Sequence, residues 1–240
     1  MKEKIVSKAI QHRRSVRIYD SKKVINTDIV KQCIQQAILA ASSSNLQLWE
    51  FYHITSKTMK EKISESCFNQ PAAKTANQLV IPVVRLDLWP KRIQSNVDFI
   101  KSVEPSKMSE KSKKGALSYY EKVLPKLYSG TNKLRGFFGK IIMQYKGVSK
   151  ITYREVSSTD LRVIGHKSTA LAAQNFMTSM AAFDYDTCPM EGFDSVRLKN
   201  ILELPKKAQI SMVIGCGIRK EEGVYGDRFR VPFEEVYFQK

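Results

Sequence analysis

The sequence contains few of the residues from which metal sites and redox motifs are built. Its four cysteines form no Cys-x-x-Cys pair, and its three histidines show no metal-ligand spacing. We therefore expect no metal site. The scattered cysteines also indicate a reducing compartment, so a cytoplasmic location is expected.

Long apolar runs are also absent. The longest, such as residues 79–84, are far too short to span a bilayer. Charged residues interrupt the first ten positions, so a secretory signal is not expected. With 42% hydrophobic and 26% charged residues, the 240-residue chain has the composition of a soluble globular protein.

Acidic residues are scarce enough to leave a formal net charge of +17. Such a charge attracts nucleic acid, anionic lipid or phosphorylated ligands. Most of the excess lies between Lys91 and Arg154, a segment whose only acidic residues are Asp98, Glu104, Glu110 and Glu121. This concentration indicates a basic insertion in an ordinary domain, and no nucleic-acid partner is expected.

Hydrophobic periodicity predicts helices alternating with strands. Helices are expected over 3–11, from the Asn26-Thr27 cap onward, and over 57–67 and 165–183, and strands over 51–55, 79–86 and 209–218. Pro82 favours an edge position or a bulge for its strand. The middle segment is predicted to be mostly helical, with breaks at Pro105, Gly115, Pro125 and Gly130, and the tail 231–240 to be an extended arm. Without repeats or linkers, residues 1–240 are expected to form one domain with a basic, mostly helical insertion at about 91–160.

A run of three arginines and a serine follows the first predicted helix: His12-Arg13-Arg14-Ser15-Val16-Arg17. Guanidinium groups bind phosphate oxygens through paired hydrogen bonds, and a hydroxyl can complete the shell. The cluster therefore indicates a phosphate site. A solvated basic turn is the alternative, and the segment taken alone favours it, because charged turns are common.

Four further segments strengthen the phosphate hypothesis by their order and spacing. They are Ser42-Ser43-x-Asn45-x-Gln47-x-Trp49, Cys67-Phe68-Asn69-Gln70-Pro71, Pro189-Met190-Glu191-Gly192-Phe193-Asp194 and Gly226-Asp227-Arg228-Phe229-Arg230-Val231-Pro232. Together with the arginine-serine cluster they resemble the FMN-dependent nitroreductases, in particular the oxygen-insensitive NAD(P)H enzymes. The resemblance covers roughly the first 90 and the last 75 residues, and the middle segment is much less alike.

The resemblance implies an α+β, three-layer nitroreductase-like fold. Its central mixed, mainly antiparallel sheet would be flanked by helices, and its C-terminal arm exchanged with a dimer partner. It further implies a homodimer that holds FMN without a covalent bond at the subunit interface. NADH or NADPH would be the electron donor.

The resemblance also implies which residues contact the flavin. Its phosphate would be held by Arg13, Ser15, Arg228 and Arg230, with Arg14 in the same run. Further contacts would come from Ser42, Ser43 and Asn45 of the partner subunit, from Asn69 and Gln70 at the ring edge, and from Pro189, Met190, Glu191 and Gly192 in the turn near flavin N5. Arg17 matches a basic position near N1, where a cation stabilises the charge left by reduction. No side chain is assigned a catalytic role, since the flavin supplies the chemistry.

The sequence departs from the family pattern at several positions. Ala41 and Leu48 replace prolines that are usual in the flavin-lining loop, which indicates a more mobile loop. Some relatives carry a lysine shortly after the position of Asn69, a place that falls near Ala72 here, and the nearest cation is Lys74. Without that cation, Arg17 alone would stabilise reduced flavin, and the flavin potential would be lower.

No protein nucleophile is indicated. The serines at 42–44 lack a Gly-x-Ser-x-Gly elbow, and no histidine belongs to an obvious triad. Cys188 is interpreted as a small buried residue rather than a reactive thiol. Gly215-Cys216-Gly217 lacks the third glycine of a dinucleotide fingerprint and is interpreted as a strand-to-loop turn.

The basic insertion contains one amphipathic stretch, in which apolar residues recur at helical spacing beside lysines and an arginine. The apolar residues are Leu134, Phe137, Phe138, Ile141, Ile142 and Tyr145. A lid or dimer-packing helix with a buried apolar face is the preferred interpretation. Contact with an anionic membrane surface is the alternative.

The function expected from the sequence is hydride transfer from NAD(P)H through flavin N5 to a nitroaromatic, quinone or similar acceptor by a ping-pong sequence. Enone reduction, reductive dehalogenation and flavin reduction are alternatives on the same scaffold. An alternative of another class is a basic membrane- or nucleic-acid-surface binding protein with a vestigial flavin site, which only the middle segment supports.

Overall fold

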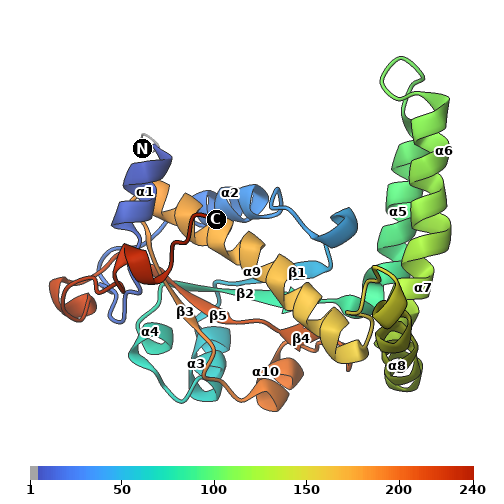
Figure 1. Ribbon diagram of the computed structural model, residues 1–240. Helices are drawn as coiled ribbons and strands as arrows, with labels where there is room; N and C mark the ends of the chain where they lie inside the picture. Colours follow the sequence, from blue (N-terminus) through green and yellow to red (C-terminus); the bar gives the residue numbers. More distant parts are fainter. Residues whose placement is uncertain (1–4) are drawn as a thin grey trace.

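The computed structural model describes residues 5–240 and places helices on both faces of a five-stranded sheet (Figure 1). The strands are β1 (Trp49–Ile54), β2 (Gln78–Val84), β3 (Asp186–Met190), β4 (Gln209–Ile210) and β5 (Val213–Gly217). The α-helices are α1 (Val6–His12), α2 (Thr27–Ala37), α3 (Lys57–Ser66), α4 (Pro71–Lys74), α5 (Trp89–Ser102), α6 (Glu110–Ser118), α7 (Leu124–Tyr128), α8 (Lys133–Ser149), α9 (Ser158–Ala182) and α10 (Ser195–Ile201).

The sheet confirms the expected mixed, mainly antiparallel arrangement. Its order is β1-β2-β5-β3, with β4 pairing β2 alongside, and the pairs between these strands are antiparallel. A parallel bridge joins Ser15 to Thr187 of β3, so the segment after α1 extends the sheet beyond β3. The arginine-rich segment is thereby fixed against the edge of the sheet.

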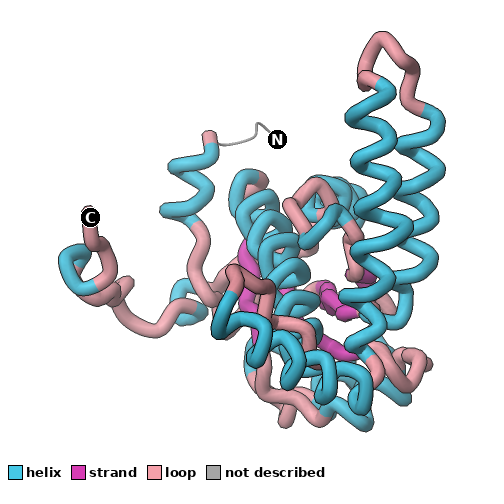
Figure 2. The backbone as a smooth tube through the Cα atoms, turned by 45° about the vertical axis from the view of Figure 1, so that its right-hand side comes forward, coloured by secondary structure: helices cyan, strands magenta, loops and turns pink. Residues whose placement is uncertain are grey.

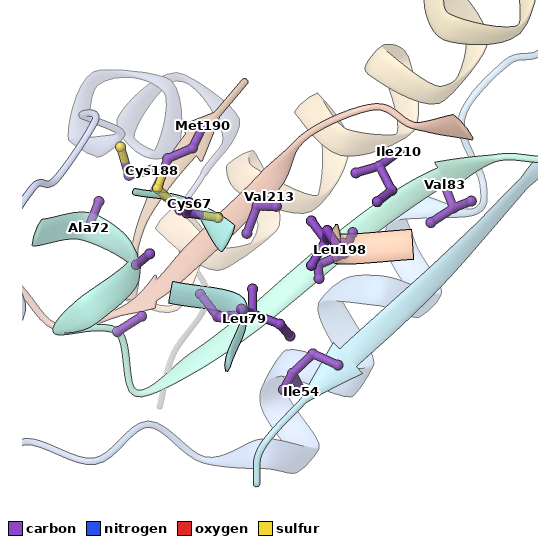
Figure 3. Packing of buried hydrophobic residues seen from close by; sticks show 14 of the residues in the cluster. Ile54, Cys67, Ala72, Leu79, Val83, Cys188, Met190, Leu198, Ile210 and Val213 are labelled. Atoms are coloured by element: carbon purple, nitrogen blue, oxygen red, sulfur yellow. The ribbon is translucent and has the colours of Figure 1, made fainter. Parts of the chain in front are cut away.

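Helices cover both faces of the sheet, and the side chains of each strand alternate between the two faces. Val80 of β2 packs with α2 and α9, whereas Leu79 and Ile81 pack with α3 and α10. Figure 3 shows the cluster on the side of α3 and α10, where Leu79 and Val213 lie close to Leu198 of α10. Three layers result, as expected, with α2 and α9 above the sheet in Figure 1 and α3, α4 and α10 below it.

Pro82 lies in the central strand β2 and not at a sheet edge. Its carbonyl accepts a hydrogen bond of 2.9 Å from Ser211 N–H, which lies between β4 and β5. In a strand the N and C=O of one residue point to the same side, so the proline nitrogen faces this break and not β1. The missing N–H therefore costs no ladder hydrogen bond to β1.

Several sequence-based boundaries are confirmed and others are wrong. Asn26 caps α2 by accepting a hydrogen bond from Asp28 N–H (2.7 Å). The strand expected over 209–218 is two strands, β4 and β5. The break expected at Gly115 does not exist, because this residue lies inside α6. Of the first expected helix, Glu3 and Lys4 lie outside the described residues.

Most of the basic segment forms helices at one end of the sheet. In Figures 1 and 2, α5 and α6 run side by side away from the body of the molecule, and α8 lies near the base of this hairpin. The apolar side chains of α8 are exposed in the single chain, so the chain itself does not cover them, and a lid or dimer-packing role for this face stays a prediction. Among residues 5–240, no helix has both the length and the apolarity needed to cross a membrane.

The glycines at the end of β5 are explained by packing and not by the expected turn. Gly215 and Gly217 belong to the strand itself and lie against the ring of the buried Tyr19. A Cβ added at Gly215 would lie 2.5 Å from the carbonyl oxygen of Ala72, in the backbone of α4. Tyr19 OH also donates a hydrogen bond to Gly215 O (2.9 Å).

We expect Gly215→Ala to lower the free energy of unfolding by about 1–3 kcal/mol, because the backbone of α4 would have to shift. Gly115→Ala is the matched control, since a Cβ there meets nothing within 4 Å. In a helix interior this control should gain roughly 0.5–1 kcal/mol. Urea unfolding measures both, and a Gly215→Ala variant as stable as the natural protein would contradict the packing argument.

Candidate functional site

Residues 13–17 leave α1 and run between β3 and the C-terminal tail. Val16 N–H donates to Thr187 O (3.1 Å), and Arg17 N–H donates to Gly223 O (2.7 Å). Val16 is fully buried, whereas its neighbours Ser15 and Arg17 are exposed. The segment is therefore anchored by one core residue and presents its polar side chains to solvent.

A buried carboxylate fixes this segment to the sheet. Asp186, whose side chain is 2% exposed, accepts hydrogen bonds from the guanidinium of Arg219 and from its backbone N–H (2.7 Å). The same guanidinium donates to His12 O (3.1 Å), and His12 Nε2 lies 3.4 Å from Asp186. Three distant parts of the chain thus meet immediately before Arg13. No pattern in the sequence predicts this connection.

The arginines predicted to hold phosphate are brought together in one pocket. It has a volume of about 240 Å³, and its charged lining consists of Arg13, Arg14, Arg17, Asp227, Arg228 and Arg230. Ser15 also lines it. Among residues 5–240, no carboxylate lies within ion-pair distance of these five arginines. The pocket therefore concentrates positive charge, with Asp227 as the one carboxylate among the described residues of its lining and outside ion-pair distance of the arginines.

The C-terminal arginines reach this pocket by contacts with the backbone. Arg228 Nη2 donates to the carbonyls of Gln11 and Arg13 (2.7 Å each), which lie at the end of α1. Arg14 donates in return to Gly226 O (2.9 Å). The carbonyls at a helix C-terminus carry partial negative charge, so a guanidinium is stabilised there. Within the described part of the chain, Arg230 donates one hydrogen bond, to the adjacent carbonyl of Phe229 (2.6 Å).

Arg13 lies in surroundings that disfavour its charged form. Burial, followed by the charges of Arg228, Arg230 and Arg14, lowers the pKa of its guanidinium. Like charges at this separation repel one another, and a bound anion would relieve the repulsion. This accumulation of positive charge fits the predicted phosphate site.

Gln70 and Gly192, predicted at the flavin edge and near N5, are in direct contact. Gln70 Nε2 donates to Gly192 O (2.7 Å). Asn69 is directed elsewhere: its carbonyl oxygen accepts a hydrogen bond from Ser64 Oγ (3.4 Å), and it lines a groove between α3 and α4 with Lys74. Gln70 is thus the residue of this pair that the fold brings to the turn after β3.

The end of β3 supports the turn and contains no reactive thiol. Pro189 and Met190 are its last residues, Met190 is buried, and Glu191 after them is exposed. Cys188 is fully buried, and burial raises the pKa of its thiol. Because a thiolate is needed for nucleophilic attack, this cysteine is suited to packing and not to catalysis.

The loop that contains Ser42, Ser43 and Asn45 has an unusual backbone. Ser44, Asn45 and Gln47 have φ angles of 52°, 51° and 48°, in the left-handed region that costs non-glycine residues about 1–3 kcal/mol each. Inside the loop, Ser42 Oγ accepts a hydrogen bond from Gln47 N–H (3.1 Å), and Ser43 N–H donates to Ser168 Oγ (3.3 Å). Such a conformation persists only where the surroundings hold it.

The helical hairpin provides this support, which the sequence did not reveal. Asn96 of α5 donates to Asn45 O (3.2 Å) and accepts from Asn45 Nδ2 (3.1 Å). Tyr120 OH donates to Ser44 O (2.9 Å), and Tyr119 OH shares a hydrogen bond of 2.7 Å with Ser44 Oγ. Both tyrosines belong to a widened π turn, Tyr119–Val123, between α6 and α7. The insertion therefore shapes a predicted flavin-contacting loop.

Within one chain the predicted site residues other than Asn69 form two groups. The first contains Arg13, Arg14, Ser15, Arg17, Arg228 and Arg230, together with Gln70, Pro189, Met190, Glu191 and Gly192 around the end of β3. The second contains Ser42, Ser43 and Asn45. It lies against α9 and the helical hairpin, toward the opposite end of the molecule from α1 and α4 (Figure 1). The chain by itself does not bring the two groups together.

Comparisons with known proteins identify the family of the chain. The family model described as "Nitroreductase family" matches residues 10–218. A putative NAD(P)H nitroreductase of Staphylococcus haemolyticus is 26% identical over 98% of this chain and 97% of its own length, and the protein DrgA of Synechocystis is 24% identical over 89% and 84%.

Solved structures show the same fold. A putative NAD(P)H:FMN oxidoreductase from Staphylococcus epidermidis superposes with a TM-score of 0.76 at 23% identity, covering 100% of this chain and 98% of its own. A putative nitroreductase in complex with FMN from Exiguobacterium sibiricum gives 0.70 at 20% identity, covering 100% and 99%. Because the family model spans most of the sequence, from α1 to the residue after β5, this chain belongs to the nitroreductase family.

Proposed function

We propose that this protein is a homodimeric, FMN-dependent oxidoreductase. It would take hydride from NADH or NADPH and pass electrons to a nitroaromatic, quinone or similar small acceptor in a ping-pong sequence. The observation that carries the proposal is the arginine pocket, because five guanidinium groups that form no ion pair with a carboxylate of residues 5–240 favour a bound anion. Relatives named putative NAD(P)H nitroreductases, and a structural neighbour solved in complex with FMN, support the choice of anion.

The donors of the pocket fit the phosphate of FMN. Arg13, Ser15 and Arg230 would bind its oxygens, with Arg14 and Arg228 adding charge while they fasten the C-terminal segment to α1. Gln70, beside the turn at Gly192, would hydrogen-bond the ring edge. FMN, when bound, accepts hydride from a nicotinamide and returns two electrons to an acceptor, so no side chain has to act as a nucleophile.

Arg17 would stabilise the negative charge of the reduced flavin ring. This arginine lies in the same pocket, whereas Ala72, near the place of the lysine of some relatives, is fully buried in the core. Lys74 lines the groove between α3 and α4 together with Lys57, Lys60 and Lys220. A single cation stabilises a developing anion less than two do, so a comparatively low flavin potential is expected.

A homodimer would complete the site. Ser42, Ser43 and Asn45 would line the flavin of the partner subunit, which accounts for their separation from the arginine pocket in one chain. The C-terminal arm supports this arrangement, because its apolar side chains Phe229, Phe233, Val236, Tyr237 and Phe238 are exposed. Arm exchange between subunits would bury them.

The first experiment is an absorbance spectrum of the purified protein. We expect a yellow protein that retains FMN and bleaches when NADH or NADPH is added without oxygen. The bleached protein is then offered a nitroaromatic, a quinone or an enone, and the acceptor that restores the colour fastest identifies the acceptor class. Colourless protein that cannot take up FMN would exclude the proposed function.

The two C-terminal arginines should separate phosphate binding from folding. Arg230→Ala should weaken FMN affinity roughly tenfold to a hundredfold, the effect of one charge-assisted hydrogen bond, with little change in the melting temperature. Arg228→Ala should also lower the melting temperature, because the carbonyls of Gln11 and Arg13 lose their donor. Quenching of FMN fluorescence gives the affinities. Arg197→Ala, which removes an exposed arginine of α10, is the control. An Arg230→Ala variant that binds FMN like this control would refute the phosphate assignment.

Asn96 should affect flavin binding through the loop that it holds. Asn96→Ala removes both hydrogen bonds to Asn45, so we expect about tenfold weaker FMN affinity. Gln94→Ala is the matched control, because this exposed amide on the same helix bonds only Asp98 among the described residues. The same fluorescence titration measures both variants. Equal affinities for FMN would mean that the hairpin does not shape the flavin site.

A further inference from the structure

Helix α8 packs against the rest of the chain with its glycine-bearing face. A Cβ at Gly136 would lie 2.5 Å from Gly130 O and 2.8 Å from Ser158 N, so only glycine fits this contact. Gly147, three turns further along, lies against the guanidinium of Arg154. Lys140 on the same face pairs with Asp160 near the start of α9 (3.0 Å). The inward face of the helix is therefore small and polar.

The opposite face is apolar and exposed. It is formed by Leu134, Phe137, Phe138, Ile141, Ile142, Tyr145 and Val148, which recur at intervals of three and four residues. Tyr145 and Val148 are 82% and 85% exposed. A surface helix of a globular protein normally turns this stripe toward the core. A continuous exposed apolar patch marks a surface that contacts something else.

The charges beside the stripe restrict what that partner can be. The sequence contains no aspartate or glutamate between Glu121 and Glu155. Lys133, Arg135, Lys146 and Lys150 are exposed on or directly after α8, and no carboxylate of residues 5–240 lies within ion-pair distance of them. The surface is therefore apolar and cationic at the same time.

We propose that α8 binds an anionic lipid membrane, with its axis parallel to the surface. Its apolar stripe would enter the acyl boundary while the flanking cations meet lipid phosphates, the pattern of interfacial helices. Two α8 helices paired with each other would place their cations side by side, so lipid phosphates are a more favourable partner for these cations than a second α8. Figures 1 and 2 place the helix at the periphery, away from α1 and the C-terminus.

The proposal goes beyond the flavin chemistry and does not depend on it. The inward face of α8 already fulfils its packing role through Gly136 and Lys140, so the outward face is available for a lipid surface. Contact with lipid would give the protein access to apolar molecules that dissolve in membranes. Lys113 of α6 is less suited to this contact, since it donates to the carbonyls of Lys101 and Val103 inside the hairpin.

The test is co-sedimentation of the full-length protein with vesicles of phosphatidylcholine, alone or mixed with phosphatidylglycerol. We expect binding to the mixed vesicles only, decreasing as salt is raised. Phe138→Ser combined with Tyr145→Ser should reduce binding at least tenfold. Lys146→Gln combined with Lys150→Gln should reduce it by roughly fivefold per lysine.

Matched controls distinguish binding by the α8 stripe from binding caused by net charge or by exposed apolar side chains in general. Val24→Ser with Leu39→Ser removes two exposed apolar side chains elsewhere, and Lys111→Gln with Lys114→Gln removes two exposed lysines of α6. Both controls should bind vesicles within twofold of the natural protein, and circular dichroism should show every variant folded. Failure of the natural protein to bind mixed vesicles would overturn the proposal, as would equal loss in the controls. So would a stripe variant that changes the oligomeric state in sedimentation velocity but not vesicle binding.

Discussion

The buried carboxylate of Asp186 is the constraint on which the arginine pocket depends. It joins the start of β3 to Arg219 after β5, and Arg219 joins both to His12 at the end of α1. A buried charge that loses its partner costs several kcal/mol, so these three segments cannot separate independently. The arginine-rich segment begins at the next residue and therefore leaves this junction in a fixed direction.

The fold also reduces the repulsion between the arginines that lie together in the pocket. Arg228 is stabilised by carbonyls at the end of α1, and Arg14 by the carbonyl of Gly226, so part of the repulsion is offset by dipoles instead of carboxylates. Carboxylate partners would neutralise the pocket and compete with a phosphate. Backbone dipoles hold the guanidinium groups in place and leave the net positive charge available.

Much of the fold could be predicted because its signals are local. The Asn26 cap and the buried strand β2 depend on nearby residues, and the resemblance added the order of the layers. Contacts between distant segments could not be predicted. A glycine is needed at position 215 because Tyr19 and the backbone of Ala72 leave no room for a Cβ. The hydrogen bond from Arg219 to Asp186 joins residues 33 positions apart. The support of Asn45 by Asn96 and Tyr120 likewise exists only once α5 and the π turn lie beside the loop.

The π turn at Tyr119–Val123 has a consequence for variation in chain length. It contains one residue more than an α-helical turn would, and so sets the rotation of α7 relative to α6. Deleting a residue there would rotate everything beyond by about 100°, taking Leu124 and Tyr128 out of the core that they fill. The tip between α5 and α6 sets no such register. Related chains that differ in hairpin length should therefore carry their gaps at the tip and keep the spacing from Tyr120 to Tyr128 constant.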